Sequence, residues 1–249
     1  MENDVSAPPS IAALHEDSNT IIAAGSETVA TTLAAILYYL AKHPIVIQKL
    51  QSQIDAVMPT PTDCNHDKMK LIPYVDDIIN ETLRLKPPTL LGGPRVTPPD
   101  GIRIDKYYVP GDVILSIPVQ QIQTDERYWK QGSEFIPERF GERRAELGTD
   151  DAPFLPFSLG KSNCVPVQVI STNLYKGAYA CIGKNMAMMA LRIATCYIAQ
   201  EFNVVFAPGE DGETFDKGAK YTFTTTAAPL KIRFLKRGQA SPSTNHCTA

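Results

Sequence analysis

The 249-residue chain carries 24 basic and 27 acidic side chains, so its net charge is only −3. This balance gives no electrostatic case for nucleic acid or for an anionic membrane surface as a partner. The cysteines are odd in number and show no C-x-x-C spacing, which predicts a reduced, intracellular chain. They are Cys64, Cys164, Cys181, Cys196 and Cys247. The longest apolar run, residues 33–41, falls short of the ~20 residues of a membrane span, so we expect no anchor.

Three helices are predicted in the first third of the chain. Apolar residues recur at helical spacing from Ile11 to a stop at His43-Pro44, with few charges between them. This pattern predicts one long helix that runs through a domain interior. A second helix is expected from Pro44 to Pro59, and a third from Pro73 to Pro87.

The pattern then changes to short strands and irregular segments. Residues 101–104 and 113–115 flank a Pro-Gly-Asp turn and predict a hairpin. Residues 125–160 predict a long, irregular but packed segment, followed by a buried helix over residues 186–198. Residues 204–206 and 230–234 are expected to pair. The expected fold is mainly α with small β-sheets.

Four short motifs follow one another in a fixed order. They are Ala-Gly-Ser-Glu-Thr at 24–28, Glu-x-x-Arg at 81–84, Pro-Glu-Arg-Phe at 137–140, and a Phe-x-x-Gly turn from Phe157 with a Cys-x-Gly before a helix. A lone Glu-x-x-Arg pair usually lies on a solvated helix face and carries little weight. Together and in this order, the motifs resemble the C-terminal half of a cytochrome P450.

The resemblance implies roles for particular residues. Glu81, Arg84 and Arg139 would form a buried structural charge triad, and Arg95 would pair with a haem propionate. Glu27 and Thr28 would relay protons to bound dioxygen. Residues 88–93 and 223–225 would line the substrate pocket.

Two cysteines, Cys164 and Cys181, compete to be the thiolate ligand of the haem iron. Phe157, Gly160 and Cys164 fit the family pattern Phe-x-x-Gly-x-x-x-Cys-x-Gly except that Pro166 replaces the last glycine. Without residues 161–177, Cys181 and Gly183 complete the pattern, and Tyr179 takes the place of its usual arginine. A helical sequence follows Cys181, and free amides at a helix start stabilise a thiolate. We therefore favour Cys181, with Cys164 as the alternative.

The segment 161–177 reads as an insertion of 17 residues, or 51 nucleotides. Lys161-Ser162 after Gly160 can be encoded with a splice-donor sequence, Thr172-Asn173 with a fungal-type branch sequence, and Lys176-Gly177 with an intron end. We infer a retained fungal intron. The alternative is a genuine surface insertion, which a long loop tolerates at modest entropic cost.

The resemblance implies a haem-thiolate monooxygenase that inserts one atom of O2 into an apolar small molecule. Its cofactor would be haem b, and its electrons would come from an NADPH-dependent cytochrome P450 reductase. The competing reading is a truncated fragment that does not bind haem productively. Residues 1–237 would be the C-terminal part of one haem-binding domain, and residues 238–249 a disordered tail. Full-length relatives are expected at the cytosolic face of the endoplasmic reticulum, whereas this chain would be soluble.

Overall fold

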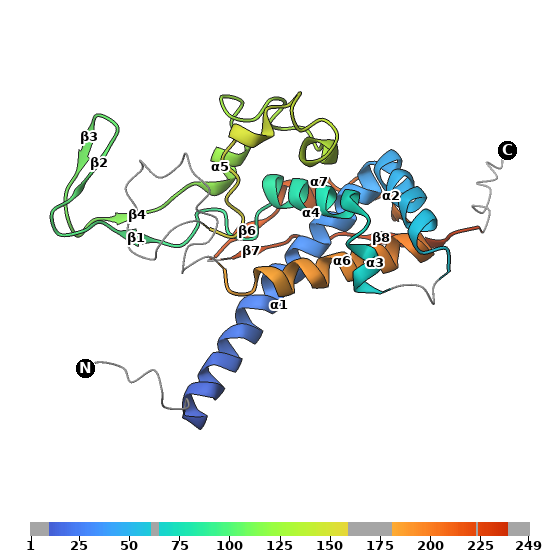
Figure 1. Cartoon of the computed structure of the whole chain (residues 1–249), viewed down its shortest axis with the longest axis horizontal. Coiled ribbons are helices and arrows are strands. Elements are labelled where there is room, and N and C mark those ends of the chain that lie inside the picture. The colour runs from blue at the N-terminus through green and yellow to red at the C-terminus, as the bar shows by residue number, and fades with distance from the viewer. Residues whose placement is uncertain (1–9, 61–64, 159–180, 223, 239–249) are drawn as a thin grey trace.

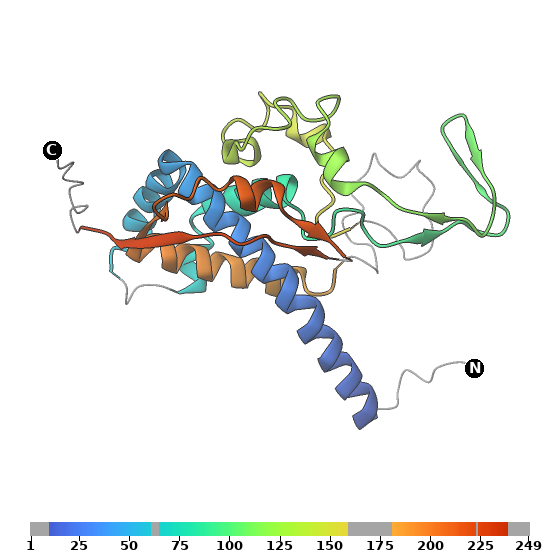
Figure 2. The ribbon, with the colours of Figure 1, turned by 180° about the vertical axis from the view of Figure 1, so that it is seen from behind.

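The computed structural model describes residues 10–60, 65–158, 181–222 and 224–238. Helices form the body of the molecule, and short two-stranded sheets lie around it (Figures 1 and 2). The helices are α1 (Ile11–Lys42), α2 (Pro44–Val57), α3 (His66–Met69), α4 (Pro73–Leu85), α5 (Val119–Thr124), the 3₁₀ helices η2 (Pro137–Phe140) and η3 (Thr149–Asp151), α6 (Lys184–Glu201) and α7 (Glu213–Lys217). The strands are β1 (Arg95–Val96), β2 (Ile102–Ile104), β3 (Tyr107–Val109), β4 (Ile114–Leu115), β5 (Phe202–Phe206), β6 (Lys220–Tyr221), β7 (Thr225–Thr226) and β8 (Ile232–Lys236).

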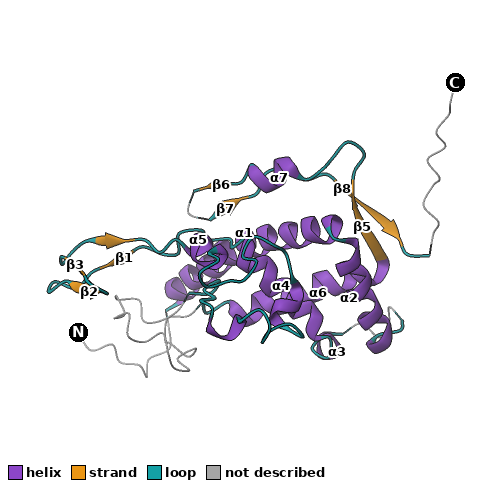
Figure 3. Ribbon diagram, turned by 90° about the horizontal axis from the view of Figure 1, so that it is seen from above, coloured by secondary structure: helices purple, strands orange, loops and turns teal. Residues whose placement is uncertain are grey.

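The hydrophobic core lies where α1, α2, α4 and α6 pack against one another (Figure 3). Proline stands at the first helical position of both α2 and α4, where its missing N–H costs nothing. On α4 the apolar residues Val75, Ile78, Ile79 and Leu83 are all buried. The three helices predicted in the first third are confirmed, and α6 confirms the helix predicted over residues 186–198. The helix is buried on one face only, because Met186, Met189 and Tyr197 are exposed.

The long helix α1 is buried over only its second half. Its buried residues begin at Thr32, whereas Ile11 and Ile22 are 74% and 68% exposed. The expectation that the whole helix runs through a domain interior is therefore wrong for its first half, because no other described element packs there. Figure 1 shows this half projecting from the body. Among the described residues, α1 alone is long and apolar enough to cross a membrane, a test that buried core helices also pass.

The strand pairing around residues 95–115 differs from the prediction. Strand β2 pairs with β3, with Ile102 opposite Val109, and β4 pairs instead with β1, with Leu115 opposite Arg95. The tight turn falls at Asp105, which adopts a positive φ of 54° that aspartate tolerates. The Pro-Gly-Asp sequence was the stronger turn signal but lies between two sheets. The β2–β3 hairpin extends away from the helices (Figures 1 and 2).

The remaining predictions for the second half agree with the structure where it is described. Strands β5 and β8 pair antiparallel, with Val204 opposite Phe234. Residues 125–158 form turns and 3₁₀ helices around the fully buried Trp129. The short β6–β7 pair and α7 were not predicted. The predicted insertion 161–177 and the predicted tail beyond Gly238 lie outside the described residues.

Candidate functional site

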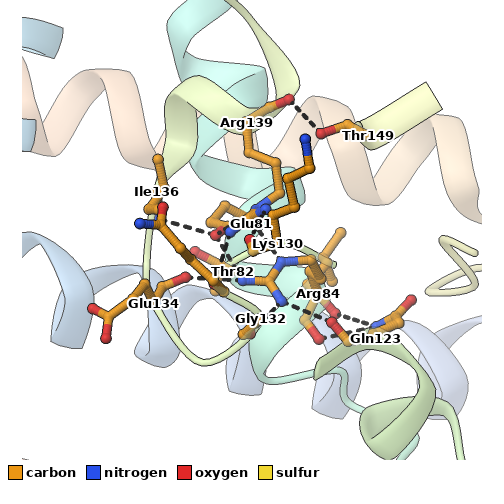
Figure 4. A network of polar contacts seen from close by, with 12 residues as sticks. Glu81, Thr82, Arg84, Gln123, Lys130, Gly132, Glu134, Ile136, Arg139 and Thr149 are labelled. Carbon is orange, nitrogen blue, oxygen red and sulfur yellow. Dashed lines mark hydrogen bonds and ion pairs between the residues drawn. The ribbon is translucent and has the colours of Figure 1, made fainter. Parts of the chain in front are cut away.

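A buried charge cluster joins α4 to η2 (Figure 4). Glu81 and Arg84 lie three residues apart on α4, so their side chains share one helix face. Arg84 donates two hydrogen bonds to Glu81, from Nε to Oε2 at 2.7 Å and from Nη2 to Oε1 at 2.8 Å. Arg139 Nε lies 3.3 Å from Glu81 Oε1. The structure thus brings the three predicted residues together, each with no exposed side-chain surface.

The two guanidinium groups of this cluster also hold the irregular segment that precedes η2. Arg84 donates to the carbonyl oxygens of Gln123, Gly132 and Glu134 at 2.6–2.9 Å. Arg139 donates to the carbonyls of Lys130 and Gln131 at 2.7 and 2.9 Å. A segment without regular hydrogen bonding satisfies its carbonyls in this way.

One carboxylate faces two buried guanidinium groups, so the cluster carries excess positive charge. Burial lowers the pKa of Arg139, against the opposing effect of Glu81. The indole of Trp129 offsets part of this cost, because the guanidinium carbons of Arg84 and Arg139 lie 5.1 and 5.8 Å from its ring centre. The sequence analysis placed Trp129 in a packed segment but did not link it to the cluster; a lone tryptophan amid charged residues was the available signal.

Cys181 lies at the start of α6, two residues before the Gly183 that caps the helix. Its backbone N–H donates to the Phe157 carbonyl at 3.2 Å, and its own carbonyl accepts from the Lys184 N–H at 3.2 Å. The cysteine is exposed and forms no disulfide. A side chain at Gly183 would come within 3.8 Å of the cysteine sulfur. The structure therefore joins Phe157, Cys181 and Gly183 in one loop, whereas Gly160, Cys164 and Tyr179 lie outside the described residues.

Arg95 points to the same loop from strand β1. Its Nη2 donates to the hydroxyl of Ser158 at 3.1 Å. Ser158 directly follows Phe157 and has a positive φ of 61°, so the backbone turns sharply there. A partly exposed guanidinium beside the cysteine loop is a suitable partner for an acidic group bound between them.

Glu27 and Thr28 lie in the middle of α1, where the turn before β7 approaches the helix. Glu27 Oε2 accepts a hydrogen bond from the Thr224 hydroxyl at 2.6 Å, and Thr28 donates to the Ala24 carbonyl at 2.8 Å. The helix continues unbroken through this region, and a Cβ added at Gly25 would meet no atom within 4 Å. Sequence analysis missed the contact between Glu27 and Thr224.

The two segments expected to line a substrate pocket meet beside α1. The Thr225 N–H donates to the Pro88 carbonyl at 2.7 Å, and the Thr31 hydroxyl donates to the Thr225 carbonyl at 3.1 Å. Phe223 lies outside the described residues. Thus α1, the segment after α4 and the β6–β7 turn converge at one point.

The described residues suit a haem held by a single protein ligand. They contain no group of three or more His, Cys, Asp or Glu side chains able to hold a metal ion together. A haem would need only one thiolate from the protein, because the porphyrin ring itself supplies four nitrogen ligands to the iron. Cys181 offers an accessible sulfur at the start of an 18-residue helix, and Arg95 offers a cation nearby.

The family model for cytochrome P450 matches residues 2–165. The chain belongs to the cytochrome P450 family. That match ends within the predicted insertion, one residue after Cys164. A crystal structure of a cytochrome P450 superposes with a TM-score of 0.67 and 26% identity, over 88% of this chain and 44% of that one.

Several fungal relatives align with most of this cytochrome P450 chain. The cytochrome P450 monooxygenase eupD of a Phoma species is 41% identical over 95% of this chain and 76% of its own length. The monooxygenase orf5 of Eupenicillium brefeldianum is 38% identical over 91% of this chain but 42% of its own length. Tryprostatin B 6-hydroxylase of Aspergillus fumigatus is 34% identical, over 79% and 32%. The chain thus spans less than half the length of most of these relatives.

Proposed function

We propose that this chain forms the haem-binding part of a monooxygenase that acts on an apolar small molecule in fungal secondary metabolism. The observation that carries the proposal is the hydrogen bond from the Cys181 N–H to the Phe157 carbonyl, which joins the first residue of the Phe-x-x-Gly motif to the cysteine of the Cys-x-Gly motif before α6. The names of the fungal relatives, monooxygenase and hydroxylase, support the same reaction class.

Each predicted residue has a task in this proposal. Cys181 would hold haem b through its sulfur, and Arg95 would bind a propionate of the haem. Bound haem supplies the activation of O2, with electrons from an NADPH-dependent cytochrome P450 reductase. Glu27 and the Thr28 hydroxyl would pass protons along α1 toward the bound gas. Thr224 would hold the Glu27 carboxylate in place.

The carbon monoxide difference spectrum of the expressed chain tests this proposal. We expect the red-shifted Soret band of thiolate-ligated iron in the unaltered chain and in Cys164→Ala, and its loss in Cys181→Ala. Loss of the band in Cys164→Ala alone would identify Cys164 as the iron ligand instead. Absence of the band from the unaltered chain supplied with haem would favour the non-catalytic fragment instead.

The segment 161–177 is proposed to be a retained intron rather than part of the mature protein. The contact between Phe157 and Cys181 supports this, because the two ends of the connection that contains the segment already meet. Sequencing of the transcript tests the idea: most messages should lack these 51 nucleotides. A majority that retain them would contradict it.

A further inference from the structure

Gln123, a fully buried residue on α5, touches three parts of the site at once. Its side-chain nitrogen donates to the carbonyls of Leu83 and Arg84 at 3.2 and 3.0 Å. Its side-chain oxygen accepts from the Leu155 N–H at 2.6 Å. Its backbone carbonyl accepts from Arg84 Nη1 at 2.7 Å. Figure 4 shows Gln123 beside Arg84 at the edge of the charge cluster.

A neutral primary amide suits this position, because it offers two donors at one end and an acceptor at the other. Leu83 and Arg84 belong to the last turn of α4, whose carbonyls have no partner within the helix. The amide nitrogen satisfies both of them, which leaves the amide oxygen for Leu155. The hydrogen-bond partners thus fix which way the amide points.

The contact with Leu155 leads directly to the cysteine loop. Two residues after Leu155, the Phe157 carbonyl accepts the hydrogen bond from the Cys181 N–H. Arg84, Gln123, Leu155, Phe157 and Cys181 therefore form a series in which neighbours are joined by a hydrogen bond or by two peptide bonds. We propose that Gln123 is a positioning residue, which fixes the Cys181 backbone relative to the charge cluster.

The value of this positioning to the protein rests on the proposed function, but the first test of the positioning itself needs no haem. Amide hydrogen exchange of the full chain is measured for Gln123→Met, which keeps the side chain's length and removes its three hydrogen bonds. We expect exchange at the Cys181 amide to accelerate about tenfold, because a buried hydrogen bond that anchors its partner segment is lost. The amides of α2 report global unfolding and should change less.

Gln120→Met is the matched control. Gln120 lies one turn earlier on α5 and its side chain donates to the Leu85 carbonyl at 3.2 Å, so it caps α4 without touching Leu155. It should leave Cys181 exchange close to that of the unaltered chain. Equal acceleration at Cys181 in both variants would overturn the proposal, since loss of the helix cap alone would then explain the effect.

Gln123→Glu provides a rescue and covers the case in which Gln123→Met fails to fold. A glutamate keeps an oxygen for the Leu155 N–H but not the paired donors for α4. Cys181 exchange should stay close to that of the unaltered chain even if the melting temperature falls. Acceleration at Cys181 beyond that of the α2 amides would contradict the role of the Leu155 contact.

A spectroscopic arm connects the result to the proposed function. In haem-loaded protein, Gln123→Met should lower the fraction of thiolate-ligated iron while Gln120→Met keeps it. An unchanged fraction in Gln123→Met would overturn the positioning role at the iron. If the unaltered chain shows no thiolate band, the proposed function fails, whereas the exchange data still decide whether Gln123 positions Cys181.

Discussion

Glu81 has to compensate two buried guanidinium groups, and this makes it the residue on which the fold depends most. Breaking a buried pair costs far more than the pair contributes, because the remaining charge stays out of water. Here the loss of one carboxylate would leave both Arg84 and Arg139 without an ionic partner.

The substitution Glu81→Gln tests this dependence. We expect it to lower the free energy of unfolding by about 3–5 kcal/mol, a large part of the ~5–15 kcal/mol typical of a domain. Urea unfolding followed by circular dichroism measures the change. The control is Glu142→Gln, which removes only a partly exposed ion pair with Lys49 and should cost less than about 1 kcal/mol. A similar small change in both variants would show that the carbonyl contacts alone hold the cluster.

Asp77 on α4 is the residue for which we expect a clear dependence on pH. Burial first, and then the nearby Asp76 and Glu138, raise its pKa from 3.8 to about 7, although Lys49 acts in the opposite direction and Glu142 adds to the increase. The pKa of Asp77 is therefore higher in the folded protein than in the unfolded chain. As a result, the free energy of unfolding falls as the pH rises from 3.8 to about 7.

The substitution Asp77→Asn should therefore stabilise the protein at about pH 8, by about 1–2 kcal/mol once solvent screening is allowed for. The gain should vanish at about pH 3, below the unfolded-state pKa of 3.8, where the carboxyl is largely protonated in both states. Urea unfolding at the two pH values measures it. Asp150→Asn serves as control: it removes only an exposed ion pair with Arg144 and should change the free energy of unfolding by less than about 1 kcal/mol at either pH. No pH dependence of the Asp77→Asn effect would refute the assignment.

At the scale of elements, α1 combines two different environments in one helix. Residues from Thr32 onward pack into the core, whereas the first half relies on its own hydrogen bonds and on the Ser10 side chain, which accepts from the Ala13 N–H at 3.1 Å. Helices of about 12–15 residues without tertiary packing are only marginally stable in water.

We therefore expect amide exchange to be steeply graded along α1. The amides of residues 14–22 should exchange at most about a hundredfold more slowly than those of an unfolded chain. The amides of residues 35–42 should exchange almost only through global unfolding. Mass spectrometry of peptides from each half measures the gradient, with α4 as the protected reference. Uniform protection would mean that another surface covers Ile11 and Ile22, and dilution would show whether that surface is a second copy.

Sequence patterns predicted the helices well, and the pairing of short strands poorly. Apolar periodicity and proline boundaries are local signals, so α1, α2, α4 and α6 could be located from them. The partner of β4 depends on which of two turns closes the hairpin, and the turn at Asp105 carries a weaker signal than Pro-Gly-Asp. Gln123 was missed for a similar reason, since its contacts join residues 32 to 40 positions away.

At the scale of the whole molecule, Phe157 and Cys181 contact each other directly, so the fold at this point does not depend on the segment between them. Removal of residues 161–177 shortens the connection over residues 159–180 to five residues. Loop-closure entropy then predicts a gain of only about 1 kcal/mol in the free energy of unfolding. Urea unfolding of the deletion variant measures this. A deletion variant that cannot fold would show that the segment is an integral part of the protein.

The buried Trp129 has a practical consequence. It is the sole tryptophan of the chain, and it lies against both Arg84 and Arg139. Excitation selective for indole therefore reports on a single location in the molecule. In the purified protein, its emission would follow the integrity of the Glu81 cluster in real time, without any added dye or label.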